Sequence, residues 1–206
     1  MNKENTTLIE SHLAQFFTTE DEVFFFDDIQ DKDFPVDIFW IRNSGKRDFQ
    51  ILLTAGVSQK AMDVPNESGI CPYIELALLL PSDWKTEEDD LKNPVWGWPI
   101  PLLKIIGRFP HDNNCLLTFG HSLALSVEHP LPGTKFTAVL LLKSIHLPES
   151  FQHISAQDKE IEIYLVFPLY QSEFEYLEKN PVFSLLELFD KKGITDIVNV
   201  NREAAV

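Results

Sequence analysis

The chain has 206 residues, of which 44% are apolar and 24% are charged, so it can bury a core and is not disordered as a whole. Seventeen basic residues against thirty-two acidic ones give a net charge of −15, which disfavours nucleic acid and anionic membranes as partners. The longest apolar runs have five residues, whereas a membrane-spanning helix needs about 20. Such a charge favours a basic protein partner, although it also serves simple solubility.

The two cysteines, Cys71 and Cys115, lie in different segments and form no C-x-x-C motif. The first residues, MNKENTTLIESHL, lack the apolar stretch of a signal peptide. Both observations lead us to expect a cytoplasmic protein. Because no Gly- or Ser-rich linker and no internal repeat divides the chain, we expect a single domain over residues 1–206.

The predicted elements begin with an amphipathic helix over residues 7–17, where Thr7 and Glu10 have the spacing of a capping box. Four strands follow, and Asn43, Ser44 and Gly45 supply the turn of a hairpin between the second and third. The ranges of these strands are 23–26, 35–42, 48–56 and 73–80.

A short helix and a loop are expected at 82–98, where Pro94 and Pro99 interrupt regular structure. The next helix covers 100–109, with Pro101 in its first turn and its end before Pro110.

Two strands and two helices complete the predicted chain. Residues 136–143 should form a central strand, and the alternation over 160–167 predicts a strand with one solvated face. A helix is predicted over 170–179. A last helix has Asn180 as its N-cap, Pro181 at its first position and Gly193 just beyond its end. Because strands and helices do not alternate, we expect an α+β fold with a mixed, mainly antiparallel sheet flanked by helices.

One polar segment, FPHDNNCLLTFGH, could carry chemistry because it contains His111, Asp112, Cys115 and His121. A thiol near imidazoles could form a Cys–His nucleophile pair, and the same groups could bind zinc. Neither spacing matches a known motif, so a polar loop after a helix is the alternative interpretation. Since no nucleotide, metal-protease or hydrolase motif is present, we assign no catalytic, cofactor-binding or metal-binding residue.

The other histidines have no partners in sequence and are expected on the surface or in loops. They are His12, His129, His146 and His153.

The segment 82–98 combines carboxylates with tryptophans, the composition of an interface that meets a basic protein. The alternative is a solvated acidic face with tryptophans, including Trp98, that pack in the core or tether the loop. The candidate partner-binding residues are Trp84, Glu87, Glu88, Asp89, Asp90 and Trp96.

Several longer motifs, in this order and spacing, resemble the bacterial branch of the suppressor-of-fused domain family. The resemblance spans nearly the whole chain. It rests on LLTAGVSQKAMDVP at 52–65, ELALLLPSDWK at 75–85, WPIPLLKIIGRFPHDNNCLLTFGHSL at 98–123, IEIYLVFPLYQSEFEYL at 161–177 and LLELFDKKGITDIVNVNR at 185–202.

The resemblance implies an α+β fold in which Gly56 allows a sharp turn and His121 bonds to backbone in a bend. Animal members of the family bind and sequester a transcription factor, and many bacterial members resemble immunity proteins or antitoxins encoded beside toxins. We therefore expect a non-enzymatic cytoplasmic protein that neutralises a toxin by binding it, and the acidic charge fits a basic toxin. The alternatives are an enzyme that uses Cys115, His111 and His121, or an interaction module with a non-toxin partner.

Overall fold

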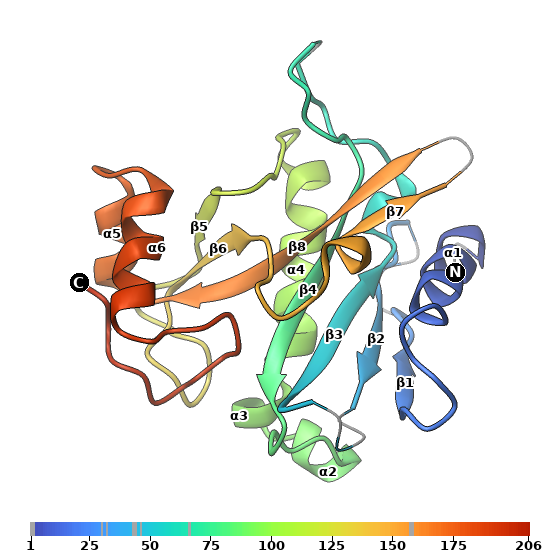
Figure 1. Cartoon of the computed structure of the whole chain (residues 1–206), viewed down its shortest axis with the longest axis horizontal. Helices are drawn as coiled ribbons and strands as arrows, with labels where there is room; N and C mark the ends of the chain where they lie inside the picture. The colour runs from blue at the N-terminus through green and yellow to red at the C-terminus, as the bar shows by residue number, and fades with distance from the viewer. Residues whose placement is uncertain are drawn as a thin grey trace.

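The computed structural model describes residues 3–29, 31, 33–42, 45, 47–65, 67–156 and 159–206. Within these residues, eight strands form one twisted sheet in the order β1-β2-β3-β4-β8-β6-β5, and β7 also pairs with β8 (Figure 1). Their bounds are β1 Val23–Phe26, β2 Asp37–Ile41, β3 Phe49–Ala55, β4 Ile74–Pro81, β5 Ser122–Ala124, β6 Ala138–Leu142, β7 His153–Ser155 and β8 Glu160–Leu169.

The sheet is mixed but mainly antiparallel, as predicted. Strands β4 and β8 run parallel, with Ile74 opposite Glu162, and the other described pairs are antiparallel. The hairpin of β2 and β3 is confirmed by its register, in which Ile41 faces Ile51. Of its predicted turn residues, Asn43 and Ser44 lie outside the described residues.

The described helices are short except for α1 and α4, and none is long and apolar enough to cross a membrane. Their bounds are α1 Lys3–Leu13, η1 Val57–Gln59, α2 Glu88–Leu91, α3 Pro94–Gly97, α4 Pro99–Asp112, η2 Glu149–Phe151, α5 Gln171–Leu177 and α6 Val182–Lys191. Helices α5 and α6 lie at one end of the sheet and α1 near the other (Figure 1).

Alternating side chains of the central strands divide the core into two faces. Ile38 and Trp40 of β2 belong to the cluster that α4 covers, whereas Phe39 and Ile41 belong to the cluster that α1 and η2 cover. A third cluster joins β6 and β8 to α5 and α6. Helix α4 is therefore held against the sheet by its buried face, which leaves its other side available.

The turn after β3 confirms the prediction for Gly56. Its φ of 146° lies outside the range that other residues adopt readily. A Cβ at this position would lie 2.3 Å from the backbone oxygen of Pro35. The amides of Gly56 and Ser58 donate to the fully buried carboxylate of Glu75 at 3.0 and 3.1 Å, which fixes the turn against β4.

Three predicted helix boundaries are wrong. Helix α1 begins at Lys3, so Thr7 lies inside it and forms no capping box. Helix α4 continues through Pro110 to Asp112, because a proline near the end of a helix costs only one bond. Asn180 does not cap α6; its side-chain amide donates instead to the oxygen of Tyr176, at the end of α5.

Strand β8 is buried on both faces over most of its length, so the predicted solvated face is wrong. The strand lies inside the sheet and is covered by all three core clusters. Its polar positions, Glu160 and Glu162, lie only at its first end. Strands β5 and β7 are absent from the prediction because three residues are too few to show a period.

Candidate functional site

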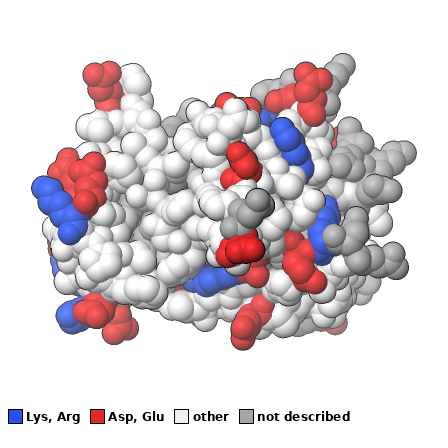
Figure 2. All heavy atoms as spheres, turned by 90° about the horizontal axis from the view of Figure 1, so that it is seen from above, with Lys and Arg blue, Asp and Glu red and all other residues white. Residues whose placement is uncertain are grey.

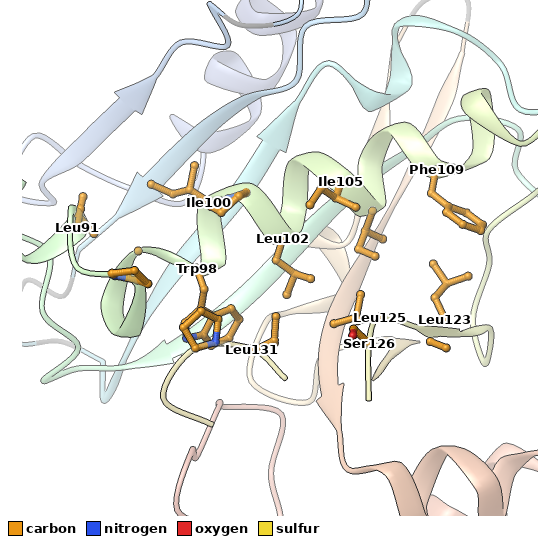
Figure 3. A pocket seen from close by; sticks show the side chains of 16 residues that line it. Leu91, Trp98, Ile100, Leu102, Ile105, Phe109, Leu123, Leu125, Ser126 and Leu131 are labelled. Atoms are coloured by element: carbon orange, nitrogen blue, oxygen red, sulfur yellow. The ribbon is translucent and has the colours of Figure 1, made fainter. Parts of the chain in front are cut away.

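An apolar groove with a volume of about 830 Å³ lies beside α4. Leu102 and Phe109 project from α4 into the groove, and Leu123, Leu125 and Leu131 face them from the other wall (Figure 3). Ile105 also lines the groove and is 59% exposed. A large exposed apolar surface of this kind marks a binding site more often than an accident of packing.

The two walls come from separate parts of the chain. Helix α4 buries Leu103 and Ile106 against the sheet, which leaves Ile105 at the surface. The opposite wall is β5 and the loop that follows it. In that loop the amide of Leu125 donates to Thr137 at 2.8 Å, and the amide of Leu131 to Phe136 at 2.9 Å. These backbone bonds hold the loop at a fixed distance from α4.

The predicted acidic and aromatic segment forms one end of the groove. Leu91, Pro94 and Trp98 of this segment line it. Trp84 packs edge-on against Trp96 and Trp98, with ring centroids 5.1 and 5.7 Å apart. Trp84 itself is only 5% exposed and donates its indole N–H to the oxygen of Trp96 at 3.0 Å. The Trp84 side chain therefore tethers the segment and offers no open surface to a partner.

The indole nitrogen of Trp98 is buried and has no hydrogen-bond acceptor among the described residues. A buried donor without an acceptor costs about 1–3 kcal/mol. Part of the Trp98 side chain lines the groove, but its nitrogen lies below the surface, so the fold itself carries this cost.

The acidic candidates lie beside the groove rather than in it. Helix α2 contains Glu88, Asp89 and Asp90, directly before the groove residue Leu91. Glu88 and Asp89 are almost fully exposed and pair with Lys92 at 3.2 and 2.9 Å. Exposed pairs of this kind contribute little to stability, so these carboxylates remain available to a charged partner.

Glu87 is also exposed, and its carboxylate lies 3.3 Å from the guanidinium of Arg42. Acidic side chains are otherwise spread over the molecule. Figure 2 shows them scattered across one face, with fewer basic side chains between them. The charge of this face is therefore diffuse, and it does not by itself define a single acidic patch.

The candidate Cys–His group is not assembled as a reactive pair. His111 lies with Nε2 3.4 Å from the oxygen of Val57, and His121 with Nδ1 3.3 Å from the oxygen of Leu116. Burial raises the pKa of Cys115, the opposite of what an activated thiol requires. The backbone contact of His121 confirms the role expected for it in a bend. Across the described residues, no three His, Cys, Asp or Glu side chains are arranged to hold a metal ion.

Three other histidines have partners that the sequence did not reveal. His12 is buried against η2 and lies 2.9 Å from the oxygen of Phe151. His146 pairs with Asp196, and His153 lies between Glu160 and Glu162 at 2.7 and 2.9 Å. The expectation of a surface or loop position is therefore wrong for His12, which is buried in α1, but it holds for His146, exposed in a loop, and for His153, exposed on β7.

Comparison with known proteins identifies the family to which this chain belongs. The family model of the suppressor of fused protein (SUFU) matches residues 32–203. The chain therefore belongs to the suppressor of fused family, as its motifs indicated. No curated protein matches the sequence closely enough to count as a relative.

Solved structures share the fold at low sequence identity. A protein from Neisseria gonorrhoeae FA 1090 described as a SUFU homologue has a TM-score of 0.74 at 15% identity, over 100% of this chain and 98% of that one. The Sufu–Fu complex gives 0.66 at 15% identity, over 98% of this chain and 91% of that one. Drosophila Suppressor of Fused gives 0.59 at 15% identity, over 98% of this chain but 51% of that one.

Proposed function

We propose that this chain is a non-enzymatic protein-binding domain whose groove beside α4 holds an apolar segment of a partner protein. The observation that carries the proposal is the groove itself, which is apolar, open and long enough to involve α2, α4 and β5. The solved Sufu–Fu structure is a complex, which supports protein binding by this fold.

The partner that fits this site is apolar where it enters the groove and basic beside it. The exposed carboxylates of Glu87, Glu88 and Asp89, and the half-buried Asp90, adjoin the end of the groove that Leu91 and Trp98 line. These charges would attract a basic partner and speed its association more than they would slow its release.

Within this role, we propose an immunity protein or antitoxin of the cytoplasm that neutralises a basic toxin by covering its surface. The net charge of −15 and the resemblance to bacterial members support this finer assignment. A module with a non-toxin partner would use the same groove, so only the partner's own activity distinguishes the two functions.

The test starts from the tagged full chain, purified from its native cells, with the stoichiometric partner identified and the complex rebuilt from pure components. We expect Ile105→Asp to weaken binding at least tenfold, because it places a charge inside the groove. The matched control is Ile145→Asp, since Ile145 is 76% exposed and lies outside the groove. It should bind as the wild type does.

Expression of the partner alone then tests the toxin assignment. Growth arrest that the wild-type chain relieves, but the Ile105→Asp variant does not, would support an immunity role. A partner that binds Ile105→Asp as tightly as wild type would place the interface elsewhere and overturn the groove proposal. A partner that does not arrest growth would be consistent with binding in the groove but would exclude the antitoxin assignment.

A further inference from the structure

The outer edge of β1 is a second candidate binding surface, because it is an edge strand made only of apolar residues. β1 ends the strand order and pairs only with β2 (Figure 1). Its sequence is Val-Phe-Phe-Phe, without a charge or a proline. Val23, Phe24 and Phe25 are 43%, 39% and 41% exposed. Natural edge strands are usually protected by charged side chains, prolines or bulges, and this strand has neither a charge nor a proline of its own.

The register fixes which backbone groups face outward. The amide of Arg42 donates to the oxygen of Glu22 at 2.9 Å, so residue 22 faces β2. Because bonded residues alternate in an antiparallel pair, Phe24 and Phe26 also bond to β2. The N–H and C=O groups of Val23 and Phe25 therefore point away from the sheet, where a further strand would lie.

Apolar side chains flank this edge on both faces of the sheet. Phe25 packs against Phe39 with ring centroids 5.0 Å apart, on the face that α1 covers. Phe24 lies on the opposite face, where the guanidinium of Arg42 sits 4.1 Å from its ring. An added strand would thus meet apolar surface above and below its backbone.

Acidic residues stand at both ends of the strand. Glu22 is exposed at the first end, with Arg42 3.6 Å away, and Asp27 is exposed at the other. Lys104 and Arg108 pair with the neighbouring Asp28, and the ammonium of Lys104 also lies 3.5 Å from the backbone oxygen of Asp27, whose carboxylate remains at the surface. Self-pairing of two copies across β1, with Phe24 at the centre, would set Glu20 and Asp21 of one copy opposite Asp28 and Asp27 of the other. Like charges placed opposite each other destabilise such a pair.

We propose that the β1 edge binds an extended segment of a partner protein, about four apolar residues long with Lys or Arg at each end, as an added strand. Backbone bonds to Val23 and Phe25 supply affinity, and the acidic ends supply selection for basic flanks. This surface lies at the opposite end of the sheet from the groove, so it is independent of the proposed groove function.

The test uses the full chain labelled with ¹⁵N and a synthetic probe peptide, Lys-Lys-Val-Val-Val-Val-Lys-Lys. At saturation we expect amide hydrogen exchange of Val23 and Phe25 to slow at least tenfold, because their N–H groups gain acceptors. Exchange of Phe24 and Phe26 should change little, since they are already bonded. A peptide with glutamates in place of lysines, and one with prolines in place of valines, should have no effect.

Variants separate this edge from other apolar surfaces. Phe25→Glu should abolish the effect on Val23, whereas Phe183→Glu, at an exposed position on α6, should not. Ile105→Asp should also leave the effect intact, because the groove takes no part in it.

Three results would overturn the proposal. The first is unchanged exchange at Val23 and Phe25 in the wild-type chain. The second is equal protection by the glutamate peptide, which would remove the selection for basic flanks. The third is protection that rises with protein concentration without any peptide, which would make a second copy of the chain the occupant.

Discussion

His12, on α1, and His153, on β7, have opposite effects on the pH dependence of stability. Burial lowers the pKa of His12, whose ring also contacts Phe16 and Phe151. Hydrogen bonding to Glu162, and then to Glu160, raises the pKa of His153, although its burial acts in the other direction. The folded chain thus disfavours a proton on His12 and favours one on His153.

The pH dependence of folding follows from these signs. For His12, the folded state binds fewer protons than the unfolded state below about pH 6.5, so stability falls with acidity there. We expect His12→Gln to flatten this fall, by at most about 1.4 kcal/mol per pH unit. For His153, stability is complete below about pH 6.5 and is lost as pH rises through its higher folded pKa. His153→Gln should therefore change the slope only above pH 6.5.

Urea unfolding at pH 5.5, 6.5 and 7.5 would measure both slopes. Burial also lowers the pKa of His111, so some loss in acid remains in the His12→Gln variant. A slope below pH 6.5 that His12→Gln leaves unchanged would contradict the assignment of the acid effect to His12.

At the scale of elements, helix α4 depends on one close approach. Gly107 faces the sheet, and a Cβ there would lie 2.7 Å from Cγ2 of Val57 in the buried η1. Helix propensity alone predicts that Gly107→Ala stabilises the chain by about 1 kcal/mol. We expect a net loss of about 1–2 kcal/mol instead, because overpacking costs more than propensity returns.

The sign of this effect should reverse when the obstacle is removed. In a Val57→Ala background, the added methyl group has space, so Gly107→Ala should then stabilise the chain. Urea unfolding of the four members of the cycle would give a coupling of at least about 1 kcal/mol. Stabilisation by Gly107→Ala in the wild-type background would show that Val57 moves aside freely.

Apolar runs predicted the longer strands, which are buried on both faces, and helical periodicity predicted α4. Helix α4 and strands β2, β3, β4 and β6 were found because their apolar residues repeat over five or more positions. Strand β8 was predicted, but the prediction of one solvated face was wrong. The alternation of Glu and Ile near its first end does not reveal that the strand is paired on both edges and covered on both faces. Short strands such as β5 are decided by tertiary pairing alone.

The same limit applies to the groove. Its helical wall was predictable from the pattern of Leu102, Ile105 and Phe109. Its other wall contains Leu125 and Leu131, which lie in a loop without periodicity and were not predicted. The tryptophans were correctly singled out as a group, yet the choice between anchor and core depends on burial, which the sequence does not encode locally. Trp84 and Trp98 are buried, so they are core residues rather than exposed anchors.

Charge acts on the molecule as a whole. A net charge of −15 on one chain repels itself, and Figure 2 shows acidic residues scattered across the face that it draws. Self-repulsion of this kind destabilises the folded state and is screened by salt, since the Debye length falls from about 30 Å at 0.01 M to about 3 Å at 1 M. Raising NaCl should therefore stabilise the free chain.

Salt should have the opposite effect on a complex with a basic partner, because the same carboxylates attract it. We expect the urea midpoint of the free chain to rise between 0.01 and 0.5 M NaCl while the association rate with the partner falls. Near the sequence pI of about 4.7, the net charge vanishes and the gain in the urea midpoint should largely disappear. A general stabilisation by salt would persist at that pH. If association quickened with salt instead, the carboxylates would not steer binding, and the groove alone would account for recognition.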